Sequence, residues 1–331
     1  GLQNVAIGYG TLATNIDGDS NTAIGFKALE DFEADADGHG NNTAVGSSSM
    51  SNATTGTENT AVGASSMADG AITGDFNAAF GNNAGKSLTS GAFNTLLGGN
   101  AGIAITTGQS NVIVGLNAGD ALVEGSNNVA VGQSALSSEN AHGRNTAIGH
   151  QTLSTLDAGA DAYNTAVGYQ AGTAVTTGVQ NTIMGSLAGD ALTTGSYNVA
   201  MGHNSLSATT VGALNTAIGN FALSSNILTN GNVAIGQQAL QVAVGDGSTN
   251  NQITYNTAVG YFAGKAITTA INNTLIGGLA GDALTTGASN TLVGKNAGGA
   301  LITGSSNTVL GHGALATEDG HGFNVAIGTS S

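Results

Sequence analysis

The sequence predicts an all-β protein, a parallel β-solenoid or β-roll of about 19 coils with a 17-residue period. The first observation behind this prediction is a pentapeptide, Asn-Thr-Ala-Val-Gly with close variants, that occurs nineteen times. The second is its spacing, because fourteen of the eighteen intervals between copies are 17 residues and the others are 18, 19, 21 and 24. A short period that runs through a whole chain is typical of stacked repeats. We therefore expect a single repeat domain over residues 1–331, part of a longer fibrous protein.

Each copy opens at an asparagine, which we number as position 0 of its repeat. These asparagines are Asn4, Asn21, Asn42, Asn59, Asn77, Asn94, Asn111, Asn128, Asn145, Asn164, Asn181, Asn198, Asn215, Asn232, Asn256, Asn273, Asn290, Asn307 and Asn324.

Positions 1 to 3 predict a β-strand. Position 1 is Thr or Val in eighteen copies, and position 3 is always a large apolar residue such as Ile7 or Met184. Alternation with β-branched residues favours a strand of four or five residues. Position 4 is glycine in all nineteen copies, which indicates a turn with positive φ or a close approach of backbones. Asparagine at position 0 tolerates the left-handed conformation, and stacked copies can form a ladder of amide hydrogen bonds.

Both faces of this strand are apolar, because position 2 is alanine in thirteen copies and a larger apolar residue in six. Positions 1 and 3 lie on one face and position 2 lies on the other. A strand with two apolar faces needs cover on both. One cover is the second half of its own coil, and we expect a neighbouring chain to cover position 2.

The second half of the repeat has two forms. Position 8 is Leu or Met in ten copies and Gly in eight, and each Gly-type coil carries an aliphatic residue three positions later. All six enlarged position-2 residues follow a Gly-type coil, which predicts that neighbouring coils fill each other's gaps. These six residues are Leu96, Ile113, Ile183, Leu275, Leu292 and Val309. The additional residues of the 19-, 21- and 24-residue units fall in the closing turn, so one edge of the solenoid should carry the insertions.

The charge and composition exclude several classes of partner. The net charge is −15, from five Lys and Arg residues against twenty Asp and Glu residues. Nucleic acid and anionic lipid would repel such a chain, so neither is an expected partner. No apolar run approaches the roughly 20 residues of a membrane helix, so we expect no membrane insertion by this segment. The chain has no cysteine, which is compatible with a surface location.

The repeats resemble a known family. A pentapeptide Asn-Thr-Ala-Val-Gly, a small residue, a Leu or Gly and a closing Gly turn are similar to the head repeats of YadA-like trimeric autotransporter adhesins and to arrays in phage tail-fibre proteins. The resemblance covers residues 4–331. It implies a left-handed β-roll in which three chains wind side by side as a homotrimer. It also implies an extracellular location, on a bacterial cell surface or a virion fibre.

The predicted function is that of a structural and adhesive fibre segment, a rigid rod that presents or makes receptor contacts. Two alternatives stay open. One is a phage tail-fibre or tailspike shaft that binds a receptor. The other is an ice-binding solenoid, suggested by threonine pairs that begin at Thr106, Thr176, Thr193, Thr268 and Thr285.

No enzyme is expected. Neither paired carboxylates nor a Ser, His and Asp arrangement stands out, so we predict no catalytic and no cofactor-binding residues. An acidic turn is the candidate cation loop, formed by Asp31, Glu33, Asp35 and Asp37. Its spacing mimics the start of a calcium loop, but Ala44 stands where the bidentate Glu is needed. Two interpretations of this acidic turn stay open: it binds Ca²⁺, or it is a solvated turn without a cofactor.

Aromatic residues flank the strand on both sides. Ten of them lie directly before the repeat asparagine or directly after the turn glycine, and they either pack in seams between chains or form a surface for sugars. The first group is the candidate contact surface for a host-surface glycan or protein receptor: Phe76, Phe93, Tyr163, Tyr197, Tyr255 and Phe323. The second group consists of Tyr9, Phe26, Tyr169 and Tyr261.

Overall fold

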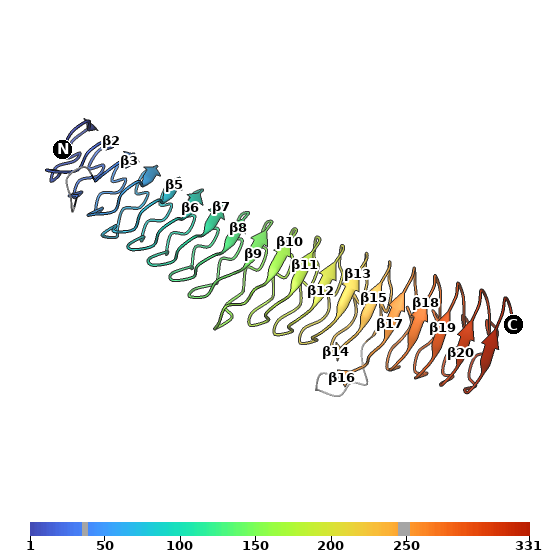
Figure 1. The fold of residues 1–331 in the computed structure, drawn as a ribbon. Coiled ribbons are helices and arrows are strands. Elements are labelled where there is room, and N and C mark those ends of the chain that lie inside the picture. The colour runs from blue at the N-terminus through green and yellow to red at the C-terminus, as the bar shows by residue number, and fades with distance from the viewer. Residues whose placement is uncertain (35–38, 244–251) are drawn as a thin grey trace. The chain divides into compact units, whose positions relative to one another are not determined.

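The expected β-solenoid is confirmed in a computed structural model of the chain, which describes residues 1–34, 39–243 and 252–331 (Figure 1). The regular secondary structure in these ranges is entirely β, and no helix in them could cross a membrane. Each copy of the pentapeptide forms one three-residue strand. The chain divides into two compact units, Gly1–Tyr163 and Asn164–Ser331.

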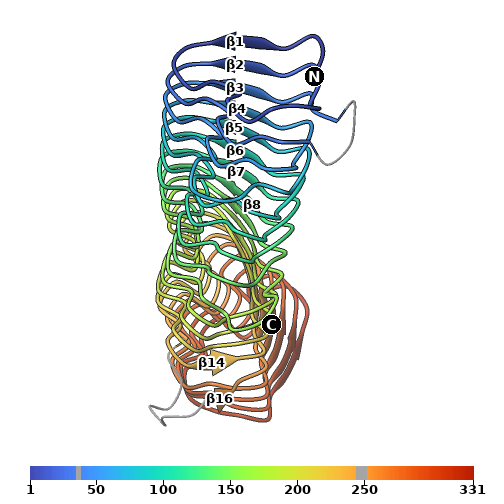
Figure 2. The same ribbon diagram turned by 90° about the vertical axis from the view of Figure 1, so that its left-hand side faces the viewer.

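The first unit is a stack of nine parallel strands. In Figure 2 its strands lie one above another with their turns in line. The register is residue for residue, so Ala44 pairs with Ala61 and Val45 with Val62. The strands are β1 (Val5–Ile7), β2 (Thr22–Ile24), β3 (Thr43–Val45), β4 (Thr60–Val62), β5 (Ala78–Phe80), β6 (Thr95–Leu97), β7 (Val112–Val114), β8 (Val129–Val131) and β9 (Thr146–Ile148).

The second unit repeats the same stack and adds one small pair of strands in the closing turns. That pair is β14 (Thr229–Asn230) and β16 (Gln252–Ile253), which run parallel. The main strands are β10 (Thr165–Val167), β11 (Thr182–Met184), β12 (Val199–Met201), β13 (Thr216–Ile218), β15 (Val233–Ile235), β17 (Thr257–Val259), β18 (Thr274–Ile276), β19 (Thr291–Val293), β20 (Thr308–Leu310) and β21 (Val325–Ile327).

The predicted ladder of asparagines is confirmed. The side-chain Oδ1 of Asn94 accepts hydrogen bonds from the main-chain N–H of Asn111 at 3.1 Å and from its Nδ2 at 3.0 Å. Nδ2 of Asn111 also donates to the Gly125 carbonyl at 2.9 Å. From Asn21 to Asn307 these side chains are at most 1% exposed. The buried Asn111 amide is therefore satisfied by its own coil and by the coils on either side of it, whereas Nδ2 of Asn21 has no hydrogen-bond partner among the described residues.

The left-handed residue, however, is the one before the asparagine. Phe93 has a φ of 60° and Ser110 a φ of 57°. Asparagine is selected at position 0 for its side-chain hydrogen bonds, and the expectation that it adopts the left-handed conformation was wrong. The strands are also shorter than the expected four or five residues, because the turns reach position 0 and position 4.

The turn glycine meets both predicted requirements. All nineteen position-4 glycines have φ between 126° and 143°, where side chains are strained. A Cβ atom on Gly168 would lie 2.5 Å from the carbonyl oxygen of Gly185 in the next coil. Glycine is required here both for its backbone conformation and for the closeness of the next coil.

The core lies inside each coil, and position 2 is part of it. Ala23 and the position-2 residues of later strands up to β20 are fully or almost fully buried within the single chain. The expectation that position 2 faces a neighbouring chain was wrong, because the second half of the coil already covers it. The space inside is narrow, which explains why alanine predominates there.

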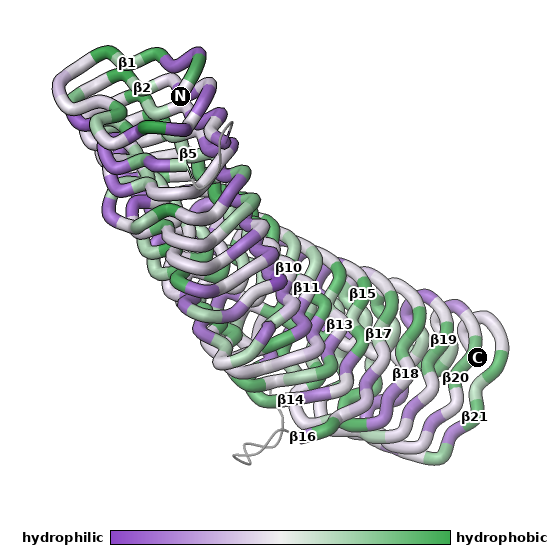
Figure 3. Tube along the Cα trace, turned by 60° about the vertical axis from the view of Figure 1, so that its left-hand side comes forward, coloured by the Kyte–Doolittle hydropathy of each residue, from purple (hydrophilic) through white to green (hydrophobic). Residues whose placement is uncertain are grey.

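Neighbouring coils fill each other's gaps as predicted. A Cβ atom on Gly85 would lie 2.5 Å from Cδ1 of Leu96, the enlarged position-2 residue of the following coil. The aliphatic residue three positions after each position-8 glycine is fully buried, as at Leu88 and Leu284. Apolar segments consequently recur from coil to coil in both units (Figure 3).

Candidate functional site

The outward side of the strands is the first candidate surface in each unit. We call it the outer sheet face and define it as positions 1 and 3 of the nineteen main strands. None of these positions carries a charged side chain. Ten position-3 side chains are at least 36% exposed: Ile7, Ile24, Phe80, Leu97 and Ile148 in the first unit, and Met184, Ile235, Ile276, Leu310 and Ile327 in the second. The other nine position-3 side chains are partly exposed. Apolar side chains that recur at the surface from coil to coil are typical of an interaction site.

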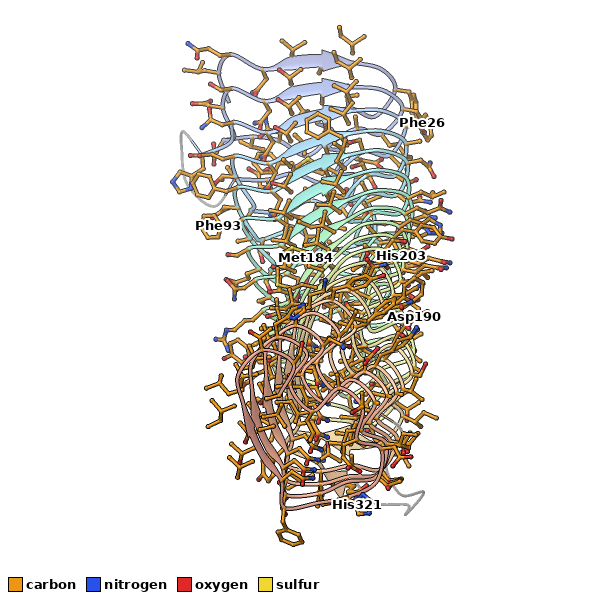
Figure 4. The ribbon with its side chains drawn as sticks, turned by 90° about the vertical axis from the view of Figure 1, so that its right-hand side faces the viewer. Phe26, Phe93, Met184, Asp190, His203 and His321 are labelled. Carbon is orange, nitrogen blue, oxygen red and sulfur yellow. The ribbon has the colours of Figure 1, made fainter. Side chains whose placement is uncertain are left out.

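Aromatic side chains border this face on both edges, as predicted. Phe26 and Phe93 project from opposite edges of the first unit in Figure 4. The rings of Phe76 and Phe93 stack with centroids 5.4 Å apart, and those of Tyr9 and Phe26 stack at 5.7 Å. The six residues of the predicted contact surface are between 49% and 87% exposed.

Tyr163 differs from the other five because the Arg144 side chain contacts its ring and its hydroxyl. The Arg144 guanidinium lies 5.4 Å from the ring centroid, and Nη1 donates to the Tyr163 hydroxyl at 2.8 Å. Arg144 also pairs with Asp161. The polar part of Tyr163 is therefore engaged within the first unit.

The predicted cation loop is described only in part, since Asp35 and Asp37 lie outside the described residues. Asp31 is exposed. The Glu33 carboxylate accepts hydrogen bonds from the main-chain N–H groups of Ile16 at 3.2 Å and Asp17 at 3.3 Å. Glu33 thus caps a turn of the preceding coil.

Three aspartates at position 9 are partly buried, and Figure 4 labels one of them, Asp190. Burial raises the pKa of Asp120, Asp190 and Asp282, and the main-chain N–H groups of each aspartate and of the next residue lower it less. In each, Oδ1 has no hydrogen-bond partner within the described part of the chain.

Two turns share the sequence Glu-x-x-His-Gly, at residues 139–143 and 318–322. In the second turn Glu318 Oε1 accepts hydrogen bonds from His321 N–H at 2.9 Å and Gly320 N–H at 3.1 Å, and lies 2.7 Å from His321 Nδ1. These bonds lower the pKa of Glu318 to about 2, and the bond to Glu318 raises the pKa of His321. The Glu318 carboxylate of this exposed turn therefore finds its partners within the turn itself.

In the first turn the glutamate is buried, and a third residue joins the cluster. The Glu139 side chain is 0% exposed, and Asp157 approaches it from the closing turn of the next coil. Burial raises the pKa of Glu139, and the main-chain N–H groups of His142 and Ala158 and the His142 ring lower it, while the Asp157 carboxylate raises it. Sequence analysis singled out neither Glu139 nor Asp157, although the repeated Glu-x-x-His-Gly motif was a signal.

Comparison with known proteins adds no family assignment. No protein-family model and no curated protein sequence matches the chain.

Proposed function

We propose that this chain is a structural and adhesive segment of an extracellular fibre, on a bacterial cell or a phage virion. In this proposal its copies associate as a homotrimer along the outer sheet face. The observation that carries the proposal is the uncharged, exposed row of position-3 side chains. The resemblance to YadA-like head repeats supports three chains rather than two.

A second copy of the chain is the partner that fits the outer sheet face best. The apolar rows repeat once per coil, at the roughly 4.8 Å spacing of paired strands. Another copy offers rows of the same spacing and chemistry. The charges that give the chain its net charge of −15 lie outside positions 1 and 3, so they do not oppose contact at this face.

The aromatic edges support the adhesive part of the proposal. Exposed rings present apolar faces that stack on sugars, and they can also close the seams between chains. A host-surface glycan or protein is the partner class we propose for the rings that association leaves exposed. A receptor-binding phage shaft has the same architecture and is the second candidate.

The threonine pairs favour a structural role over ice binding. Oγ1 of Thr106 donates to the Val123 carbonyl at 3.3 Å, and Oγ1 of Thr193 donates to the Thr210 carbonyl at 2.9 Å. A hydroxyl that bonds the next coil is not presented to ice. The first threonine of each pair therefore joins neighbouring coils, whereas second threonines such as Thr177 are exposed.

The test is the mass of the purified chain in solution. Light scattering should give about three times the chain mass of 32.0 kDa. Met184→Glu should lower that mass, because it places a charge in the apolar contact. Thr177→Glu, an exposed closing-turn position in the same unit, should leave the mass unchanged. A monodisperse monomer for the unsubstituted chain would refute the trimer.

A further inference from the structure

The cluster of Glu139, His142 and Asp157 lies within the first unit and spans two successive coils. Glu139 and His142 belong to the coil that opens at Asn128, and Asp157 belongs to the 19-residue unit that opens at Asn145. One ligand atom from each of the three side chains lies within 4.8 Å of the other two. The insertion in the closing turn brings the second carboxylate beside the turn of the preceding coil.

Two buried side-chain atoms of this cluster lack a hydrogen-bond partner within the described ranges of the chain. Glu139 Oε1 accepts a hydrogen bond from His142 N–H at 3.1 Å, but Oε2 is buried and has no hydrogen-bond partner among the described residues. His142 Nδ1 is likewise buried without one in that part of the chain, 3.4 Å from Glu139 Oε1. A buried carboxylate oxygen without a donor is unfavourable and calls for a compensating group.

The exposed turn at residues 318–322 shows that the Glu-x-x-His-Gly motif alone does not leave a glutamate oxygen buried and without a donor. Glu318 accepts from two main-chain N–H groups and lies 2.7 Å from the His321 ring nitrogen, in a turn where His321 is 84% exposed. The second turn also brings a third carboxylate, that of Asp319, beside its Glu and His. The two turns differ in the burial of the glutamate, because the Glu139 side chain is 0% exposed and that of Glu318 is 27% exposed. Burial of the Glu139 carboxylate favours a bound cation in the first turn.

We propose that Glu139, His142 and Asp157 form a binding site for a divalent transition-metal cation of the Zn²⁺ class. An imidazole nitrogen with two carboxylate oxygens suits Zn²⁺, Co²⁺ or Ni²⁺, whereas Ca²⁺ and Mg²⁺ prefer oxygen ligands alone. Ligands about 2.1 Å from a tetrahedral ion lie about 3.4 Å from one another. Asp157 is exposed and lies in an insertion, so a small shift of its side chain closes the set.

The proposed ion has a structural role. It neutralises two carboxylates, supplies the partner that Glu139 Oε2 lacks, and ties the insertion to the preceding coil. A ligand that binds the folded chain alone stabilises it by mass action. The main-chain N–H of His142 holds the Glu139 carboxylate in place, as the neighbours of metal ligands commonly do.

The experiment titrates the full chain with Zn²⁺ by calorimetry and with Co²⁺ by visible absorption, and follows the melting temperature with each ion. We expect one high-affinity ion per chain and a rise in melting temperature. His142→Ala and Asp157→Asn should each weaken Zn²⁺ binding by more than about tenfold. Both side chains are partly exposed, so these variants should fold.

His321→Ala is the matched control, because it removes the histidine of the exposed turn. It should leave the high-affinity binding and the temperature rise unchanged. The proposal is overturned if the full chain binds no Zn²⁺, if His142→Ala and Asp157→Asn bind it unchanged, or if His321→Ala abolishes binding. Preference for Ca²⁺ over Zn²⁺ would overturn the assignment of the metal class.

Discussion

The two faces of each strand show how one short repeat serves two purposes. On the inner face, Ala217 is fully buried beside a ladder of asparagines whose hydrogen bonds are all made within the chain. On the outer face, the adjacent Ile218 is partly exposed, and Ile235, which pairs with it in the next strand, is 37% exposed. The inner face therefore determines the coil, while the outer face is available to a partner. Substitutions on the two faces should consequently have different effects.

The largest difference is expected between Ala217→Asp and Ile218→Asp. The first places a charge in a filled interior without a partner, which should destabilise the coil by more than about 4 kcal/mol. The second should retain the β-rich circular dichroism spectrum and lose association instead. Chemical denaturation at several protein concentrations separates the two effects. Equal loss of folded structure in both variants would contradict the assignment of the faces.

The next effect concerns the turn glycine of the inner side. Gly168→Val should destabilise the chain by at least about 3 kcal/mol, through strain at positive φ and overlap with the Gly185 carbonyl. Gly278→Ser is the control, because a Cβ atom there meets nothing closer than 3.9 Å. Thermal melts of the two variants should differ by many degrees. Similar melting temperatures would show that position 4 tolerates side chains.

A smaller loss is expected when one amide is removed from the ladder. Asn111→Ala leaves the Gly125 carbonyl and the Asn128 N–H without their partners, which should cost about 2–4 kcal/mol. Asn82→Ala removes an exposed amide that bonds only the Ala64 carbonyl and should change stability by less than about 0.5 kcal/mol. Urea denaturation measures both values. A loss for Asn82→Ala as large as for Asn111→Ala would contradict the special role of the ladder.

The smallest effect concerns the partly buried carboxylate of Asp190, in the second half of its coil. Burial raises the pKa of Asp190 above its ordinary value of 3.8, so the folded chain holds this proton more tightly than the unfolded chain. The stability that it contributes is present below the ordinary pKa and is lost as the pH rises through the folded pKa. Asp190→Asn should therefore raise the melting temperature slightly at about pH 7 and hardly at all at about pH 3. A stabilisation that is equal at both pH values would contradict the role of burial.

The sequence predicted the solenoid because its chemistry repeats in every coil. The spacing of Asn94 and Asn111 and the invariant glycines each have one physical explanation in a stack of coils. It could not predict which face of the strand is inside, since alternation only separates position 2 from positions 1 and 3. Alanine can be assigned to the interior only when the structure shows that the second half of the coil lies close to the strand.

The candidate metal cluster could not be predicted from the sequence for a different reason. Glu139 and His142 share a turn, and their spacing is visible in the sequence. Asp157 joins them through an insertion, whose path the repeat does not determine. The cluster thus combines two residues of a regular 17-residue repeat with one residue from an insertion that breaks the period.

The asparagine ladder allows the number of coils to change by mutation in steps of one repeat. Asn111 donates to Asn94 of the preceding coil and accepts from Asn128 of the following coil, so a coil inside the stack offers the same hydrogen-bonding groups on both sides. Loss of residues 94–110 in a gene would bring Asn77 against Asn111 and keep the enlarged Ile113 after a Gly-type coil. Since the coils contribute nearly independent and nearest-neighbour energies, duplication or deletion in units of one period can lengthen or shorten the protein without redesign.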